Sequence, residues 1–168
     1  MNYATIKKTD VANGPGIRVS LFVSGCRHAC KGCFNSEAWD FAYGKPFDEN
    51  TLNEILDALG QEYIEGFSVL GGEPFEPENR ETVLNVIRAV KDRYPSMNVW
   101  CYSGFTFEEL QNTDVSKDIL GLIDVLVYGK FEEDKKNLRL SFRGSENQRL
   151  IDVKKTLESG EITLLEMQ

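Results

Sequence analysis

Three cysteines lie close together in the chain, at Cys26, Cys30 and Cys33. Cysteine thiolates hold 4Fe-4S clusters, and a complete set of protein ligands has four of them. The C-x3-C-x2-C spacing offers three thiolates and no fourth cysteine nearby, so it predicts a cluster with one iron open to a ligand that is not protein. An open iron favours chemistry on a bound molecule, whereas full ligation favours electron transfer.

Two other interpretations of these cysteines remain open. In a zinc site, Cys26, Cys30 and Cys33 would be joined by His28 or Cys101 to make a tetrahedral set. Structural zinc generally uses two separated ligand pairs, and no second pair follows this cluster. A disulfide framework fits less well, because such short spacings in a chain with an ordinary mixed core are not those of a small secreted protein.

The cysteines follow the first of several predicted strands, and these strands would set their position. Strand-forming residues predict strands at 18–24, 67–70 and 98–102, and residues 119–127 pass from a helix into a further strand. Strands that alternate with helices imply parallel pairing. There are too few such units for a closed eight-stranded barrel. The predicted fold class is therefore α/β, a partial, open (β/α) barrel with parallel strands whose open side meets a partner.

Capping boxes and helical spacing predict the helices between these strands. One helix is expected to begin at Asn50 or Thr51, with Thr51 and Glu54 as its capping box. Residues 77–93 carry apolar side chains at helical spacing. A second capping box, at Thr106, begins a short helix.

Composition sets limits on the class of protein. The chain has 168 residues, of which 41% are hydrophobic, which predicts one domain over residues 1–168. No leader pattern and no apolar run near the roughly 20 residues of a membrane helix are evident, so we expect a cytoplasmic protein without a membrane partner. A net charge of -8 argues against nucleic-acid binding.

Basic residues gather only between residues 130 and 149. Such a gathering is typical of a solvated surface, and it could also dock an acidic partner. The residues are Lys135, Lys136, Arg139, Arg143 and Arg149.

Two further loops follow predicted strands on the same side as the cysteine loop, where α/β folds bind their ligands. In the first, Gly71 and Gly72 permit close backbone approach, and Pro74 fixes the turn. Ser103 ends the next strand, where its hydroxyl could contact a ligand. The alternatives are a plain turn at the glycines and a simple strand terminator at Ser103.

Together these patterns resemble the radical S-adenosylmethionine superfamily, whose signature is C-x3-C-x2-C after the first strand and a Gly-Gly-Glu-Pro-like turn after the second. Three more segments are similar to the glycyl-radical-enzyme activases of this superfamily, and the matches run from about Asp10 to Asp152. These segments are Asn13–Arg18, Cys30–Asn35 and Arg143–Arg149.

The resemblance implies a 4Fe-4S cluster on Cys26, Cys30 and Cys33, with S-adenosylmethionine chelating the open iron. It implies that one electron, from a low-potential donor such as a flavodoxin-like protein, splits the cofactor into methionine and a 5′-deoxyadenosyl radical. That radical would take a hydrogen atom from a glycine of the partner, the glycyl-radical subunit of anaerobic ribonucleoside-triphosphate reductase. Cofactor binding would fall to Gly71, Gly72, Glu73, Pro74 and Ser103, with Glu73 accepting hydrogen bonds from the amino group.

The chain departs from the family pattern at two positions. Gly32 stands where many members have an aromatic residue against adenine, so we hypothesise that Phe34 packs there instead. Tyr128 stands where an acidic residue is expected, so no role is carried over to it. Of the remaining candidates, Cys101 is expected to be a buried small hydrophobe in its strand, and His28 a surface loop residue.

Two segments that flank the site each allow two interpretations. Asn13–Arg18 is either a turn with a solvent-facing Arg18 or an edge that faces the partner or cofactor. Arg143–Arg149 is either a generic loop or a wall of the site.

Two rival functions remain possible for the chain. They are activation of a different glycyl-radical enzyme, and a non-catalytic iron-sulfur or zinc module.

Overall fold

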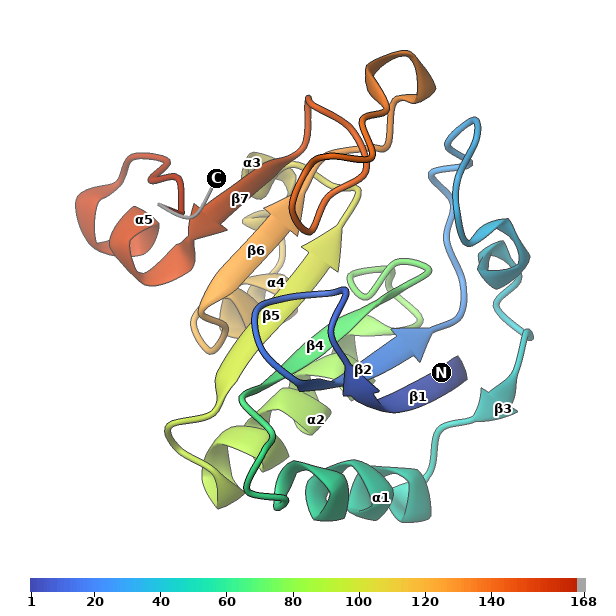
Figure 1. Ribbon diagram of the computed structural model, residues 1–168, viewed down its shortest axis with the longest axis vertical. Helices are drawn as coiled ribbons and strands as arrows, with labels where there is room; N and C mark the ends of the chain where they lie inside the picture. Colours follow the sequence, from blue (N-terminus) through green and yellow to red (C-terminus); the bar gives the residue numbers. More distant parts are fainter. Residues whose placement is uncertain (166–168) are drawn as a thin grey trace.

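The computed structural model describes residues 1–165, in which a twisted sheet runs in the order β3-β1-β2-β4-β5-β6-β7 (Figure 1). The strands are β1 (Asn2–Asp10), β2 (Arg18–Val23), β3 (Lys45–Pro46), β4 (Gly66–Gly71), β5 (Asn98–Ser103), β6 (Val125–Tyr128) and β7 (Arg149–Asp152).

Only the centre of the sheet is parallel. Strands β2, β4, β5 and β6 pair in parallel, whereas β1, β3 and β7 pair antiparallel at the edges. The α/β class is confirmed, but the sheet is open and does not close into the predicted barrel. β1 was not predicted, because its lysines and threonines leave it without the short apolar run that marked the other strands.

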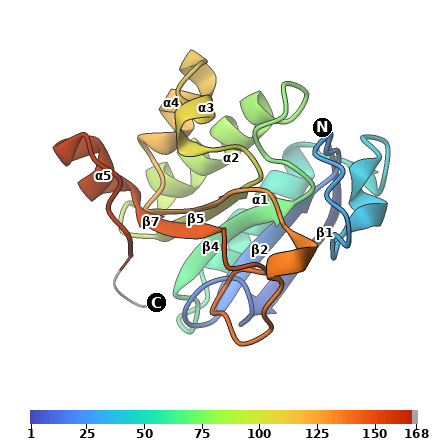
Figure 2. The same ribbon diagram turned by 90° about the horizontal axis from the view of Figure 1, so that it is seen from above.

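The helices cover one face of this sheet, and the loop between β1 and β2 crosses the other (Figure 2). Four of them, α1, α2, α3 and α4, lie between successive parallel strands, as parallel crossovers require. The helices are α1 (Glu49–Leu59), α2 (Arg80–Arg93), α3 (Phe107–Leu110), α4 (Asp114–Leu120) and α5 (Val153–Ser159), with short 3-10 turns η1 (Ser36–Trp39) and η2 (Glu133–Lys135).

The helix starts correct one of the two predicted capping boxes. In α1 the capping residue is Asp48, whose carboxylate accepts a hydrogen bond from the Thr51 backbone N–H at 3.0 Å. Glu54 instead forms an ion pair with Lys8. The prediction was wrong because an aspartate three residues earlier satisfies the free N–H groups better than Thr51 could. The Thr106–Glu109 box of α3 is confirmed.

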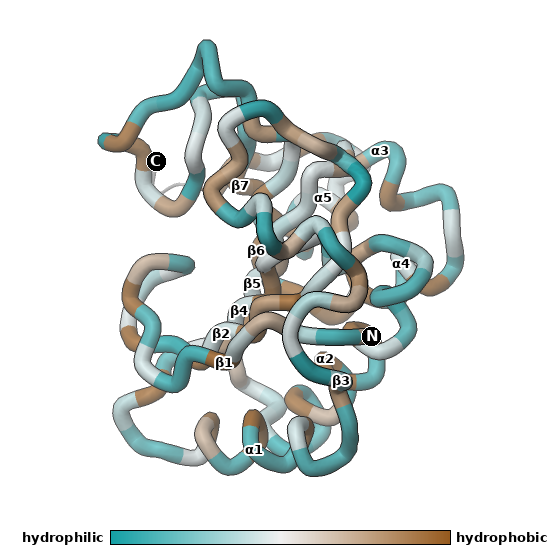
Figure 3. Tube along the Cα trace, turned by 90° about the vertical axis from the view of Figure 1, so that its right-hand side faces the viewer, coloured by the Kyte–Doolittle hydropathy of each residue, from teal (hydrophilic) through white to brown (hydrophobic). Residues whose placement is uncertain are grey.

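The main core lies between the sheet and the helices. Side chains alternate along the strands, so Val19, Leu21 and Val23 of β2 are fully buried against the helices. Cys101 of β5 belongs to this core with no exposed surface, which confirms its prediction. In Figure 3 the hydrophobic residues concentrate in the central strands. The alternate residues of each strand point to the other face of the sheet, away from the helices. On that face, Phe22 of β2 lines a cavity.

Candidate functional site

The cysteine loop follows the carboxyl end of β2, and its first residues are hydrogen-bonded to the turn η1. Gly25 and Cys26 donate backbone hydrogen bonds to the carbonyls of Ala38 and Trp39, at 2.7 and 3.1 Å. Within the loop, Ala29 adopts φ +52°, a left-handed conformation that is uncommon for a residue with a side chain. The loop therefore has a defined, sharply turned path.

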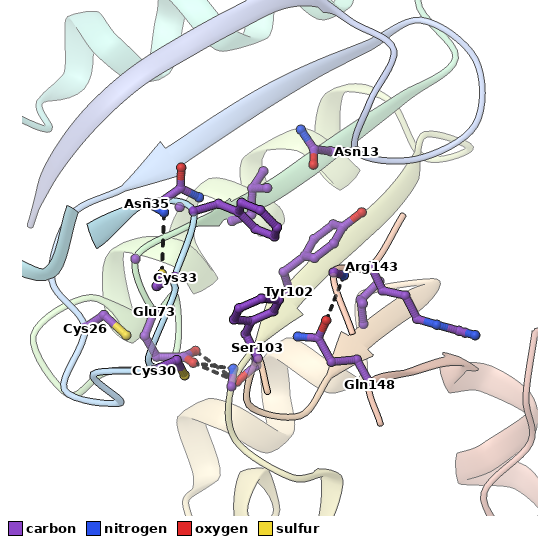
Figure 4. Close-up of a pocket in the computed structure, with 18 of the residues that line it drawn as sticks. Asn13, Cys26, Cys30, Cys33, Asn35, Glu73, Tyr102, Ser103, Arg143 and Gln148 are labelled. Atoms are coloured by element: carbon purple, nitrogen blue, oxygen red, sulfur yellow. Dashed lines mark hydrogen bonds between the residues drawn. The ribbon is translucent and has the colours of Figure 1, made fainter. Parts of the chain in front are cut away.

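This loop forms one wall of a cavity of about 500 Å³ (Figure 4). The carboxyl ends of β4 and β5 form the adjoining wall, as expected for a ligand site in a parallel sheet. Pro74 does not line the cavity. The predicted site residues that do line it are Cys26, Cys30, Cys33, Phe34, Gly71, Gly72, Glu73 and Ser103.

The three thiols of the loop line the cavity, and they must ionise before they can bind a metal. Burial, aided by the negative charges of Glu73 and Glu76, raises the pKa of Cys26 to about 11, and burial also raises the pKa of Cys30. Ligation must therefore release protons from these thiols. Cys101 lies in the core rather than the cavity wall. Over residues 1–165, no group of three or more Cys, His, Asp or Glu side chains is arranged around a single metal ion.

The glycine turn after β4 is built into the same wall. Gly71 adopts φ +114°, and a Cβ atom there would lie 2.6 Å from the backbone N and O of Val23. A Cβ atom on Gly72 would lie 2.6 Å from the carbonyl oxygen of Gly25. The Glu73 N–H donates to that same carbonyl at 2.8 Å. Close backbone approach is confirmed, and it joins the turn to the cysteine loop.

The Glu73 carboxylate is buried and already hydrogen-bonded. Its side chain is 1% exposed, and it accepts from the Gly104 and Phe75 backbone N–H groups at 2.7 and 3.0 Å. The Ser103 hydroxyl lies 2.9 Å from Oε2. His28 Nε2 lies 2.7 Å from Oε1. With these partners, Glu73 connects the loops that follow β2, β4 and β5.

His28 is therefore not the surface residue that we expected. Its side chain is only 8% exposed, and its ring packs edge-on against Phe105 with centroids 4.5 Å apart. The prediction was wrong because a loop position carries no sequence signal for the direction of its side chain, and the left-handed turn at Ala29 is visible only in the structure.

Phe34 and the segment 143–149 form the opposite wall. Phe34 is 57% exposed, and its ring centroid lies 5.0 Å from that of Phe131. The Gln148 side chain accepts from the Gly144 N–H and donates to the Gly129 carbonyl, both at 2.9 Å, and thereby holds the segment in place. Gln148 and Arg143 line the cavity (Figure 4), so this segment is a wall of the site rather than a generic loop.

Gly32 has a local reason to differ from the aromatic residue of the family pattern. Its φ is +76°, and a Cβ atom there would lie 3.0 Å from the Glu133 carboxyl carbon. A larger side chain would need both a strained backbone and a displaced Glu133.

Of the two interpretations of Asn13–Arg18, the structure excludes a solvent-facing Arg18. It is 1% exposed, and its guanidinium donates to Ser68 Oγ at 2.8 Å and to Asn98 Oδ1 at 2.9 Å. The Ser68 hydroxyl in turn donates to the Asn13 carbonyl at 2.7 Å. Arg18 also donates to the Pro15 carbonyl, so it holds the loop that borders the cavity at Asn13.

A second buried group, Asp10, holds the same loop. Burial raises its pKa, but hydrogen bonds from Ser20, Asn13 and the Ala12 N–H outweigh burial and lower the pKa below its usual value of 3.8. A lowered pKa in the folded state means that ionised Asp10 adds stability above pH 3.8. That stability is lost as the pH falls through the lowered pKa.

We expect Asp10→Asn to lower the free energy of unfolding by about 1 kcal/mol at pH 7, because it removes a charged hydrogen-bond acceptor. The difference from wild type should shrink below pH 3.8, where wild-type Asp10 also becomes neutral. Chemical denaturation at pH 7 and at acid pH measures both values. Exposed Asp92→Asn is the control, and an equal Asp10→Asn loss at both pH values would contradict the prediction.

Comparison with known proteins adds independent information on this site. Residues 12–151 match the protein-family model described as a 4Fe-4S single cluster domain. A protein of Pasteurella multocida is 43% identical over 150 residues, covering 88% of this chain and 95% of its own length, and is named anaerobic ribonucleoside-triphosphate reductase-activating protein. Proteins of the same name from Enterobacteria phage T4, 41% identical (89% and 93% covered), and Escherichia coli, 37% identical (88% and 96%), also match. The chain belongs to this family.

The matched region contains the whole candidate site. Residues 12–151 begin in the loop that Arg18 holds and end in β7, so they include the cysteine loop and both walls of the cavity. β1 and α5 lie outside the match. Over the described part of this family member, no helix is long and apolar enough to cross a membrane.

Sequence reasoning missed Tyr102 and Trp39, which also line the cavity. The Tyr102 hydroxyl and Trp39 Nε1 are buried and have no hydrogen-bond partner among the described residues. Tyr102 could have been found, because it follows core residue Cys101 and strand alternation must turn it to the opposite face. Trp39 follows a loop without such a period, so no sequence signal identified it.

Proposed function

We propose that this chain activates anaerobic ribonucleoside-triphosphate reductase by producing a glycyl radical on it. Cys26, Cys30 and Cys33 would hold three irons of a 4Fe-4S cluster, and S-adenosylmethionine would bind the fourth. A low-potential donor such as a flavodoxin-like protein would supply the electron. The names of its relatives and the match to a single-cluster domain support the partner and the cluster.

When bound and reduced by one electron, these groups supply cleavage of the sulfonium into methionine and a 5′-deoxyadenosyl radical, which takes a hydrogen atom from glycine and leaves 5′-deoxyadenosine and a glycyl radical. The chain itself orients the cofactor and excludes water. The joined Gly71–Gly72 turn and cysteine loop would hold the amino acid end of the cofactor against the cluster.

The structure refines the proposed role of Glu73. Its side chain is 1% exposed, and its two carboxylate oxygens already contact four donor groups, from His28, Phe75, Ser103 and Gly104. This leaves little capacity to accept a hydrogen bond from the cofactor's amino group. We therefore assign Glu73 to holding the turn in place, and Ser103 to holding Glu73. Contact with the cofactor would come from the backbone of the turn.

One observation carries the proposal. Three cysteines, and no other residue of their type, line a single cavity that also contains the glycine turn. A site built only to hold a cluster for electron transfer has no need of a cavity of about 500 Å³, a volume within the range of small-molecule sites.

The test is anaerobic reconstitution with iron and sulfide, followed by electron paramagnetic resonance of the reduced protein with and without S-adenosylmethionine. We expect a cofactor-dependent change in the spectrum and formation of 5′-deoxyadenosine. A cluster whose spectrum does not change when S-adenosylmethionine is added, or a protein that binds zinc instead of iron, would overturn the proposal and favour a binding module. Mixing with candidate reductases and lyases and recording which acquires a glycyl radical separates the reductase from other partners.

The hypothesis for Phe34 gives a separate prediction. Its half-exposed ring lines the cavity beside Phe131, where it could pack against adenine. We expect Phe34→Ala to raise the dissociation constant for S-adenosylmethionine about 3- to 10-fold, as loss of one aromatic contact would. Exposed Tyr63→Ala, on the far side of the sheet beside α1, is the control. An unchanged dissociation constant for Phe34→Ala would refute the hypothesis.

A further inference from the structure

His28 lies between two of the cysteines, yet it points away from solvent and into the structure. Its Nε2 atom lies 2.7 Å from Glu73 Oε1, and the two side chains are 8% and 1% exposed. A hydrogen bond to a carboxylate at this distance and burial is among the stronger single contacts a side chain can make.

The surroundings of His28 are shaped to its ring. The Phe105 ring meets it edge-on with centroids 4.5 Å apart. Gly104 lies against the other side, where an added Cβ atom would come within 2.6 Å of His28 Cδ2. The imidazole thus occupies a slot made by the loop after β5, and only glycine at position 104 leaves room for it.

The residues on either side of His28, Arg27 and Ala29, show how the cysteine loop is held. Ala29, the next residue, takes φ +52°, a conformation that persists in a residue with a side chain only when the surroundings enforce it. On the outer side, the Arg27 side chain contacts Glu76 and Glu78 and is 58% exposed. His28 is therefore the inward-facing, buried contact of the loop, and Arg27 the outward-facing, exposed one.

We propose that His28 is a positioning residue that fixes the cysteine loop against Glu73, and so sets where the open iron lies relative to the glycine turn that holds the cofactor. The inference rests on the proposed function for its cofactor, but its first step, attachment of the loop, concerns the chain alone. Because Glu73 also bonds Gly104 and Ser103, one carboxylate aligns all three loops of the cavity wall.

Three variants test this role. His28→Phe keeps the packing on Phe105 and removes the donor, whereas His28→Gln keeps an N–H donor of similar reach. Lys31→Ala, in the same loop, removes only a long ion pair between the exposed side chains of Lys31 and Glu133, which contributes little. His28→Asn, whose donor is too short to span the distance, replaces His28→Phe if that variant is insoluble.

Two readouts are needed. The first is amide hydrogen exchange of residues 26–33 in the metal-free protein, which we expect to quicken in His28→Phe and to stay near wild type in His28→Gln and Lys31→Ala. The second is the dissociation constant for S-adenosylmethionine from a spectroscopic titration of the reconstituted protein. We expect about a tenfold rise in His28→Phe, with iron and sulfide per chain unchanged.

The outcomes separate the two proposals. Recovery by His28→Gln supports positioning, whereas equal losses in His28→Gln and His28→Phe, or a dissociation constant within twofold of wild type in both, would overturn it. If the wild-type cluster does not respond to the cofactor, the proposed function fails. Exchange in the metal-free protein then still decides attachment of the loop, which is refuted if His28→Phe exchanges like wild type.

Discussion

Replacing any one of Cys26, Cys30 or Cys33 with alanine is expected to abolish cluster loading and 5′-deoxyadenosine formation. The three thiols line one cavity, and the chain has no spare cysteine beside them, because Cys101 is buried in the core. A cluster deprived of one of three protein ligands would have two of its four irons without protein attachment. Iron and sulfide analysis after anaerobic reconstitution, with product measured by chromatography, gives both results.

Cys101→Ala is the matched control for these variants. It removes a sulfur from the main core at a cost of about 1 kcal/mol in unfolding free energy, and Cys101 does not itself line the cavity. We expect it to load iron and to form 5′-deoxyadenosine as wild type does. Loss of the cluster in Cys101→Ala, or normal loading in a Cys30→Ala protein, would contradict three-cysteine ligation and favour the rival binding module.

The second large effect is expected at Gly71, where alanine should lower the unfolding free energy by about 3 kcal/mol or more. Left-handed backbone costs a residue with a side chain about 1–2 kcal/mol, and overpacking adds about 1–3 kcal/mol. The added Cβ atom would meet the Val23 backbone at 2.6 Å, where no flexible side chain can yield. For a chain of this length the melting temperature should fall by about 6–12 °C.

Gly160→Ala separates strain from crowding. Gly160 ends α5 with φ +76°, and nothing lies within 4 Å of a Cβ atom placed there. It should cost only the strain of the left-handed conformation, about 1–2 kcal/mol. Scanning calorimetry on both variants gives the comparison, and equal losses would mean that the contact with Val23 relaxes easily.

Features that depend on local order along the chain could be predicted from the sequence. The strands that became β2, β4 and β5 were identified by short apolar runs that end in glycine, and the α3 capping box by two residues three apart. Burial of Cys101 followed from its place in an apolar strand. Each of these signals lies within a few residues, where side-chain type and backbone preference act directly.

Features that depend on contacts between distant segments could not be predicted in the same way. Arg18 is buried because Ser68 and Asn98, from β4 and β5, offer acceptors to its guanidinium. His28 is buried because Glu73 and Phe105 meet it from two other loops. A charged or polar residue in a turn is usually solvated, and only its partners make burial favourable.

The sheet edges illustrate the same difference. The sequence favoured a partial barrel because the alternation of strands and helices was all that it displayed. The structure is an open sheet whose outer strands β1, β3 and β7 pair antiparallel, because the chain enters or leaves them through loops rather than through crossover α-helices. The pattern of strands and helices along the sequence did not show these connections.

By itself, the sequence determined which reactive groups come together: three cysteines at short spacing, a glycine turn, and a parallel βα frame to bring them to one edge. Only the tertiary structure decided how these parts are held, with Glu73 saturated by His28, Ser103 and Gly104 rather than free in the cavity. The physical reason is that ligand type and spacing are properties of neighbouring residues, whereas satisfaction of a buried carboxylate requires donors from three separate loops.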